Sequence, residues 1–202
     1  MVKVAILDLK LGNLLSIKKG FERADAEAII TCDAKDLAAC DCIVLPGVGA
    51  FRDAMASITP LKEELLKEVY SGKPLLGVCL GLQMLFDRSF EGGLFEGLKL
   101  IRGDAVKLPP GVKIPHMGWN TIRIVRENPL LDGVKDGAYV YFVHSYYVKP
   151  CEDNVIVAET DYGVKFPSIV SKGCLYGTQF HPEKSGKVGL KILKNFVSLV
   201  KR

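Results

Sequence analysis

Cys79 is the residue whose setting points most clearly to chemistry. It lies in Gly-Val-Cys-Leu-Gly at positions 77–81, after the apolar run 74–76 and before a segment, 82–86, that we expect to be helical. This pattern predicts a nucleophile elbow, a tight turn from strand to helix that exposes the reactive side chain. Flanking glycines tolerate the sharp reversal, and amides at the start of the helix favour the thiolate form of the sulfur. A buried structural cysteine between two unrelated glycines is the alternative.

A histidine and a glutamate near the C-terminus can complete a catalytic group with this cysteine. His181 and Glu183 stand two residues apart in Gly-Thr-Gln-Phe-His-Pro-Glu at positions 177–183. Because alternate residues of an extended segment project to the same side, the carboxylate can orient the imidazole and leave its other nitrogen free. The alternatives are a surface turn and a zinc deaminase site, but the latter requires a following Pro-Cys-x-x-Cys, which this sequence lacks. We therefore predict a Cys79–His181–Glu183 triad for thiol acyl transfer.

The glycine-rich loop after residue 45 is a candidate for stabilising charge that develops on oxygen during acyl transfer. It reads Pro-Gly-Val-Gly at positions 46–49, and no Lys-Ser/Thr pair follows to make it a phosphate loop. We predict an oxyanion hole formed by the backbone amides of Val48, Gly49 and Leu80. The glycines beside Val48 would let its peptide flip between two orientations. An ordinary strand-to-helix turn is the alternative.

The composition favours a globular enzyme domain. The chain has 202 residues, of which 49% are hydrophobic and 25% charged, so it can form one domain with a sizeable core. Its formal charge of +4, from 27 basic and 23 acidic residues, does not indicate nucleic-acid binding. Charges near the start argue against a signal peptide, and no apolar stretch is long enough to cross a bilayer. We therefore expect no membrane association and a cytoplasmic location.

The cysteines and histidines do not indicate disulfides or a metal site. Six cysteines in a chain of this length without a secretory signal are expected to be reduced. Cys40 and Cys42 are the closest pair but lack the spacing of a zinc site, and the three histidines do not cluster with cysteines. We expect no metal and no cofactor.

Alternating strand-like and helix-like segments in the first half predict a parallel sheet covered by helices on both faces. Ligands of such sheets bind beyond the carboxyl ends of the strands, where Cys79 and the loop after Leu45 would lie. The fold expected is one α/β domain over 1–202, a three-layer sandwich with a mixed, mostly parallel central sheet. The expected strands are 2–9, 26–31, 42–45, 74–78, 139–147, 155–160, 168–171 and 175–180, and the expected helices are 13–24, 50–71 with an interruption at Pro60, 82–86 and 188–200.

Five motifs together resemble the class I, or triad-type, glutamine amidotransferases over nearly the whole chain. They are LPGVGAF at 45–51, GVCLGLQ at 77–83, PHMGWN at 115–120, YFVHSYY at 141–147 and GTQFHPEKS at 177–185. The elbow and the His-Pro-Glu are shared across the superfamily. The motif at 115–120, beside that at 45–51, is similar to the branch whose members supply ammonia to a cyclase in histidine biosynthesis.

This resemblance implies that Cys79 attacks the side-chain amide of glutamine, with His181 as acid and base and Glu183 orienting it. It also implies a (β/α)₈ cyclase subunit as partner in a heterodimer, to which the ammonia passes. The implied substrate contacts are Gly47, Gly49, Gln83, Ser145 and Tyr146. The positions matching residues that face the partner are Asn13, Trp119, Asn120, Tyr141 and Lys184, for which core packing of the two aromatic residues and solvated charge at Lys184 are the alternatives.

One segment departs from the family pattern, and three other functions stay open. The family usually carries Asp-Tyr-Gly-x-Gly-Asn after its first strand, whereas positions 8–13 read Asp-Leu-Lys-Leu-Gly-Asn, which affects the expected docking and not the glutaminase chemistry. Glutaminases of pyridoxal, purine or anthranilate pathways lack the His-Met-Gly-Trp-Asn motif. Cysteine peptidase and chaperone relatives usually place a histidine directly after the nucleophile, where this chain has Leu80. A non-catalytic scaffold would not need all three triad residues.

Overall fold

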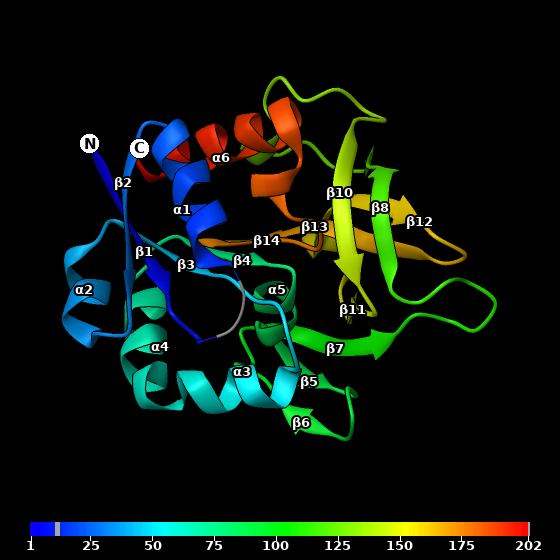
Figure 1. Ribbon diagram of the computed structural model, residues 1–202, viewed down its shortest axis with the longest axis horizontal. Coiled ribbons are helices and arrows are strands. Elements are labelled where there is room, and N and C mark those ends of the chain that lie inside the picture. The colour runs from blue at the N-terminus through cyan, green and yellow to red at the C-terminus, as the bar shows by residue number, and fades with distance from the viewer. Residues whose placement is uncertain (11–12, 202) are drawn as a thin grey trace.

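An eight-stranded sheet forms the centre of the computed structural model, which describes residues 1–10 and 13–201 (Figure 1). The strand order is β2-β1-β3-β4-β14-β13-β12-β9. Neighbours from β2 to β14 are parallel and the later pairs are antiparallel, so the sheet is mixed and mostly parallel, as predicted. The strands are β1 (Val2–Leu7), β2 (Ala26–Thr31), β3 (Cys42–Leu45), β4 (Leu75–Val78), β9 (Arg123–Ile124), β12 (Ile156–Asp161), β13 (Lys165–Lys172) and β14 (Leu175–Thr178).

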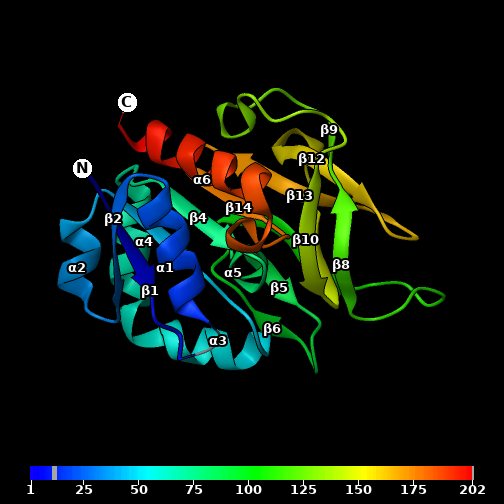
Figure 2. The ribbon, with the colours of Figure 1, turned by 45° about the horizontal axis from the view of Figure 1, so that its top comes forward.

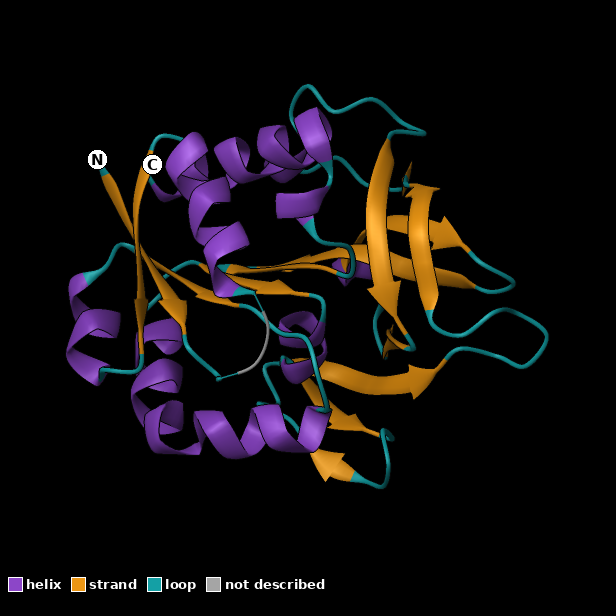
Figure 3. Cartoon of the chain, in the orientation of Figure 1, coloured by secondary structure: helices purple, strands orange, loops and turns teal. Residues whose placement is uncertain are grey.

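Helices cover both faces of this sheet because its inner strands are apolar on both sides. In β1, for example, Val4 and Ile6 belong to one core, and Ala5 and Leu7 belong to the other. Helices α1 and α6 pack on the first face, and α2 to α5 pack on the second (Figure 3). The helices are α1 (Leu14–Arg23), α2 (Ala34–Ala39), α3 (Phe51–Ile58), α4 (Lys62–Tyr70), α5 (Leu80–Met84) and α6 (Gly186–Val200).

Local signals explain where two of these helices begin and end. Asn13 caps α1, since its side-chain oxygen accepts a hydrogen bond from the Ser16 amide at 3.3 Å. The interruption predicted at Pro60 is confirmed, because the 3₁₀ turn Thr59–Leu61 separates α3 from α4. The motif residue Gly12 lies outside the described residues.

The strand predicted over 139–147 is wrong as a single element. The chain turns at Ser145, so that β10 (Tyr139–His144) joins β8 (His116–Thr121) in a two-stranded sheet. β11 (Tyr146–Pro150) instead joins a four-stranded sheet of order β11-β7-β5-β6. Figure 2 shows β8 and β10 side by side at the end of the molecule opposite α2. The other strands of the four-stranded sheet are β5 (Phe86–Ser89), β6 (Phe95–Glu96) and β7 (Ile101–Lys107).

The helix predicted over 82–86 also needs correction. It begins two residues earlier, at Leu80, because the chain turns into the helix directly at Cys79. It ends at Met84, since Phe86 begins β5 and pairs with Ile101 of β7. The predicted first strand similarly ends at Leu7, two residues before its expected end.

Candidate active site

Cys79 sits in a strained turn between β4 and α5, and the two flanking glycines make that turn possible. Its backbone has φ 55° and ψ −106°, a conformation that side-chain-bearing residues rarely adopt. A Cβ on Gly81 would lie 1.7 Å from the Leu45 carbonyl oxygen, and one on Gly77 would lie 2.7 Å from the Gly81 oxygen. The Cys79 amide bonds to the Thr178 carbonyl at 2.7 Å, which ties the turn to β14. These contacts explain why glycine is required on both sides of the cysteine.

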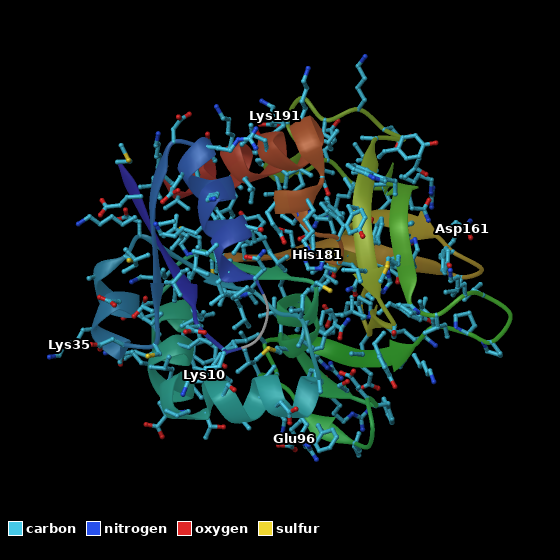
Figure 4. The ribbon with its side chains drawn as sticks, viewed as in Figure 1. Lys10, Lys35, Glu96, Asp161, His181 and Lys191 are labelled. Atoms are coloured by element: carbon cyan, nitrogen blue, oxygen red, sulfur yellow. The ribbon has the colours of Figure 1, made fainter. Side chains whose placement is uncertain are left out.

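His181 reaches the same edge of the sheet because β14 lies parallel to β4 with Thr178 opposite Val78. Its Nδ1 is 2.9 Å from Glu183 Oε1, so the ring donates to the carboxylate through Nδ1. Ser185 holds the backbone of this segment, because its hydroxyl donates to the His181 carbonyl at 2.7 Å. Figure 4 shows His181 near the middle of the molecule, where β14 ends. The imidazole is thus oriented with Nε2 directed away from the glutamate.

The charges around His181 favour its protonated form. Burial lowers the pKa of His181, but the neighbouring Cys79 thiolate and the Glu183 carboxylate outweigh that effect and raise it to about 10. Both His181 Nε2 and Glu183 Oε2 are buried without a hydrogen-bond partner among the described residues. A cationic imidazole beside a cysteine sulfur can protonate a leaving group, which thiol acyl transfer requires once the sulfur has attacked.

A cavity of about 210 Å³ opens over Cys79 and brings most of the predicted site residues together. Gly47 does not line it. That glycine instead lines a smaller cavity, together with Asn13, His181 and Glu183, none of which lines the larger one. The predicted residues that do line the larger cavity are Val48, Gly49, Leu80, Gln83, Ser145 and Tyr146.

The backbone donors predicted for an oxyanion hole are not all available in this conformation. The Leu80 amide donates to the Gly47 carbonyl at 3.3 Å, so that donor is occupied. The same carbonyl belongs to the peptide whose N–H is that of Val48. Rotating this one peptide would therefore free the Leu80 amide. It would also turn the Val48 N–H to the side where the Gly47 carbonyl now lies. Gly47 and Gly49 flank Val48, and Gly49 has a φ of 112°.

Glu91 lines the same cavity and was missed by the sequence analysis. Its Oε2 accepts a hydrogen bond from the Phe51 amide, at the start of α3, at 2.8 Å. A carboxylate held at a helix start inside a substrate-sized cavity suits an ammonium group of the ligand. No local pattern marks this residue, because it lies 12 positions after the cysteine in a segment without clear periodicity.

The residues predicted to face a partner are mostly exposed. Trp119 is 56% exposed and packs edge-on against Tyr141 with ring centroids 5.9 Å apart, so core packing of this tryptophan is excluded. Met117 and Tyr139, which the sequence analysis missed, are 61% and 62% exposed on the same two strands. The remaining predicted positions are Asn13 and Lys184, both exposed, and the half-buried Asn120, whose side chain donates to the Asp161 carbonyl at 3.0 Å.

Three further observations bear on the expectations from composition. All six cysteines are free thiols. Within residues 1–10 and 13–201, no group of three or more metal-ligating side chains is placed to hold an ion. None of the helices in the described part of the chain has the length and apolarity to cross a membrane.

Comparisons with known proteins agree with this fold. The PurLQS structure from Thermotoga maritima aligns with a TM-score of 0.77 at 19% identity, covering 98% of each chain, which shows the fold alone. The family model for Glutamine amidotransferase class-I matches residues 11–199. The chain therefore belongs to the class I glutamine amidotransferase family.

Curated relatives narrow the assignment within that family. The chain is 50% identical over 197 residues to the imidazole glycerol phosphate synthase subunit HisH of Methanocaldococcus jannaschii, covering 98% of this chain and 100% of that protein. It is 48% identical over 200 residues to the subunit of the same name from Caldanaerobacter subterraneus subsp. tengcongensis, with 98% of each covered. It belongs to the HisH subunits of imidazole glycerol phosphate synthase.

Proposed function

We propose that this chain hydrolyses glutamine to glutamate and ammonia, as one amidotransferase domain over 1–202, and passes the ammonia to a cyclase partner in histidine biosynthesis. The observation that carries the proposal is the oriented His181–Glu183 pair, whose charge is coupled to Cys79. Cys79 in turn lines a cavity of about 210 Å³. The Cys79 motif alone could mark a structural cysteine, and the His181–Glu183 motif alone could mark a surface turn.

In the first half-reaction the Cys79 sulfur attacks the side-chain carbonyl carbon of glutamine. As the carbon–nitrogen bond breaks, His181 gives its proton to the departing nitrogen, and ammonia leaves a thioester behind. Water then attacks the same carbon and gives a proton to His181, and the carbon–sulfur bond breaks to release glutamate. Glu183 stays ionised and keeps Nδ1 protonated throughout. General acid–base catalysis of this kind contributes about 10²–10⁴-fold.

The cavity walls supply binding and charge stabilisation in this proposal. Gln83, Ser145 and Tyr146 hold the amino acid from one side, and Glu91 receives its ammonium group. The Val48 and Leu80 amides bind the developing oxyanion once the peptide between Gly47 and Val48 has rotated. Because one such donor is worth about 10²–10³-fold, this rotation is a suitable point of control.

Ammonia needs a sheltered route, since free ammonia in neutral water is mostly ammonium and not a nucleophile. We infer that the route leads into a (β/α)₈ cyclase subunit docked on the exposed strands β8 and β10 in the cytoplasm. Exposed Trp119, Met117 and Tyr139 offer the aromatic and apolar anchors typical of an interface centre. The proposed interface residues also include Asn13, Asn120, Tyr141 and Lys184.

The test is glutamate release by Cys79→Ala, with Cys151→Ala as the matched control. Cys151 is an exposed thiol after β11 and outside the cavity, so its loss should leave activity unchanged. We expect Cys79→Ala to fold, by circular dichroism and urea unfolding, and to release no glutamate. Hydrolysis near the wild-type rate, or loss of the fold, would contradict the assignment.

A further inference from the structure

Gln179 is fully buried beside the nucleophile, and the reaction described above does not use it. It follows β14, and its backbone amide bonds to the Ser168 carbonyl at 2.9 Å. Its side-chain Nε2 lies 3.6 Å from Cys79 Sγ, within the range of hydrogen bonds to sulfur. A polar side chain with no solvent access normally has a structural or chemical reason to be there.

The orientation of this amide follows from the groups behind it. The Tyr146 carbonyl can only accept hydrogen bonds, so the Gln83 atom 2.9 Å away must be its Nε2. The second hydrogen on that nitrogen is directed to Gln179 Oε1 at 3.4 Å. Gln179 must therefore present its NH₂ group, and not its oxygen, to the sulfur.

A second donor fixes the carbonyl at the start of this series of bonds. His144 Nδ1 lies 2.9 Å from the Tyr146 oxygen and donates to it. Rotating the Gln83 side-chain amide by half a turn would break its hydrogen bond to the Tyr146 carbonyl. It would also bring the Gln83 oxygen against the Tyr146 oxygen, so that two acceptors faced each other. The direction of every bond from Tyr146 to Cys79 is thus determined.

The sulfur has different partners in its two protonation states. As a thiol it can donate to the Val143 carbonyl, 3.5 Å away. As a thiolate it has no hydrogen to give, and that carbonyl becomes a repulsive neighbour. The Gln179 amide and the protonated His181 are then the groups that favour the charged sulfur, and a hydrogen bond to a charged acceptor is the stronger kind.

We propose that Gln179 is a catalytic residue that donates a hydrogen bond to the Cys79 thiolate, and that Gln83 positions it. This inference rests on the proposed glutaminase function for its role in turnover. Its contact with the sulfur is independent of any substrate. Gln83 accordingly has two roles, one toward the ligand and one toward Gln179.

The experiment measures alkylation of Cys79 by iodoacetamide as a function of pH in the full chain, with each cysteine followed by peptide mass spectrometry. We expect Gln179→Met, which removes the donor, to raise the pH of half-maximal alkylation of Cys79 by about one unit. Gln179→Glu keeps the shape but places an acceptor at the sulfur, so its shift should be larger. The exposed Cys32 and Cys151 serve as internal references whose profiles stay unchanged.

Ser168→Ala is the matched control, because the Ser168 hydroxyl is buried and has no hydrogen-bond partner in the described part of the chain, although it lies near the same backbone. Its alkylation profile should equal that of the wild type. An unchanged Cys79 profile in folded Gln179→Met, or an equal shift in Ser168→Ala, would overturn the proposal. Should Gln179→Met fail to fold, the isosteric Gln179→Glu decides by the same criterion.

Turnover gives a second readout that separates this proposal from the proposed function. Gln179→Met should lower kcat for glutamate release about tenfold with little change in KM. A shifted alkylation profile in a chain whose wild type releases no glutamate, even with the cyclase subunit and its ribonucleotide ligand, would support the Gln179 contact and refute the glutaminase. A normal profile with intact glutaminase activity would refute only the role of Gln179.

Discussion

Lowering the pH from 7 to about 4.5 should destabilise this fold chiefly through His116 and His144. Both rings are buried, and His116 Nδ1 lies 2.9 Å from His144 Nε2. Since His144 donates through Nδ1 to the Tyr146 carbonyl, its Nε2 must accept the hydrogen on His116 Nδ1. The remaining nitrogen of His116 faces the Asn120 amide at 3.4 Å. Neither ring can gain a proton without breaking this arrangement.

The pKa values follow from this burial. Desolvation lowers the pKa of His116 to about 4 and is the main cause that lowers the pKa of His144 to about 3. In the unfolded chain both would titrate near 6.5. The unfolded state therefore binds more protons as the pH falls below 6.5, so stability is full above that pH and is lost toward the folded values.

The size of the effect can be worked out because the chain has only three histidines. Each depressed histidine contributes a slope of up to about 1.4 kcal/mol per pH unit, or about 2 kcal/mol between pH 6.5 and 4.5. The third, His181, has a raised pKa and keeps its proton in the folded state throughout this range, so it offsets a small part of the loss near pH 6.5 and adds no slope well below that pH. A hydrogen bond from Lys73 lowers the pKa of Glu68, so the stability that this carboxylate contributes is lost only below about pH 4.5. The expected total is about 4 kcal/mol, a large part of a typical folding free energy of about 5–15 kcal/mol.

Urea unfolding followed by circular dichroism at about pH 7, 5.5 and 4.5 measures this loss. The variant His116→Gln can still donate to His144 Nε2 but cannot titrate, so its acid loss should be smaller by about 2 kcal/mol. The variant will be less stable at pH 7, because His116 stacks against Phe142 and Tyr162. The two proteins are therefore compared by how steeply the free energy of unfolding changes with pH, and not by its value at one pH. A wild-type stability that stays flat between pH 6.5 and 4.5 would refute this reasoning.

Three further variants test the site. Glu91→Gln should raise KM for glutamine about 10–100-fold with little change in kcat, because it removes the negative charge that would face the ammonium group of glutamine. A fall in kcat alone would argue against this contact. Glu183→Gln should fold and lose about 10²–10⁴-fold in kcat, since the tautomer of His181 is no longer enforced; steady-state activity near that of the wild type would exclude the orienting role. Gly81→Ala should lower the free energy of unfolding by more than about 3 kcal/mol, because the new Cβ meets the Leu45 carbonyl. Gly72→Ala, where the Cβ has open space, should lower it only by the backbone strain of about 1–3 kcal/mol. Equal losses of the two variants in urea unfolding would contradict the steric account.

The parts of the site that depend on short spacings could be predicted from the sequence. A glycine-flanked cysteine after an apolar run specifies its own turn. His181 and Glu183 are close in sequence and do meet, but the extended segment expected between them is wrong, because Pro182–Lys184 forms a 3₁₀ turn. Parallel strands then bring both segments to one edge, as β4 and β14 do. These are local rules or rules of sheet topology, so a single sequence contains them.

Glu91 and Gln179 depend on contacts that no local pattern records. Glu91 reaches the cavity through the four-stranded sheet and its bond to Phe51, 40 positions away. Gln179 meets Cys79 across 100 positions, and the direction of its amide depends on Tyr146 and Gln83. The expected strand over 139–147 failed for a similar reason, because two different partner strands divide it at Ser145.

The most direct test of the central claim is the rate of glutamate release from glutamine by the purified chain, alone and with a cyclase subunit plus its ribonucleotide ligand. Leu80 donates to the Gly47 carbonyl in the isolated chain, so the oxyanion donors proposed above are not assembled. We therefore expect a low rate alone and a strong rise in the full mixture. A rate that is the same with and without the cyclase and its ligand would contradict a partner-gated glutaminase.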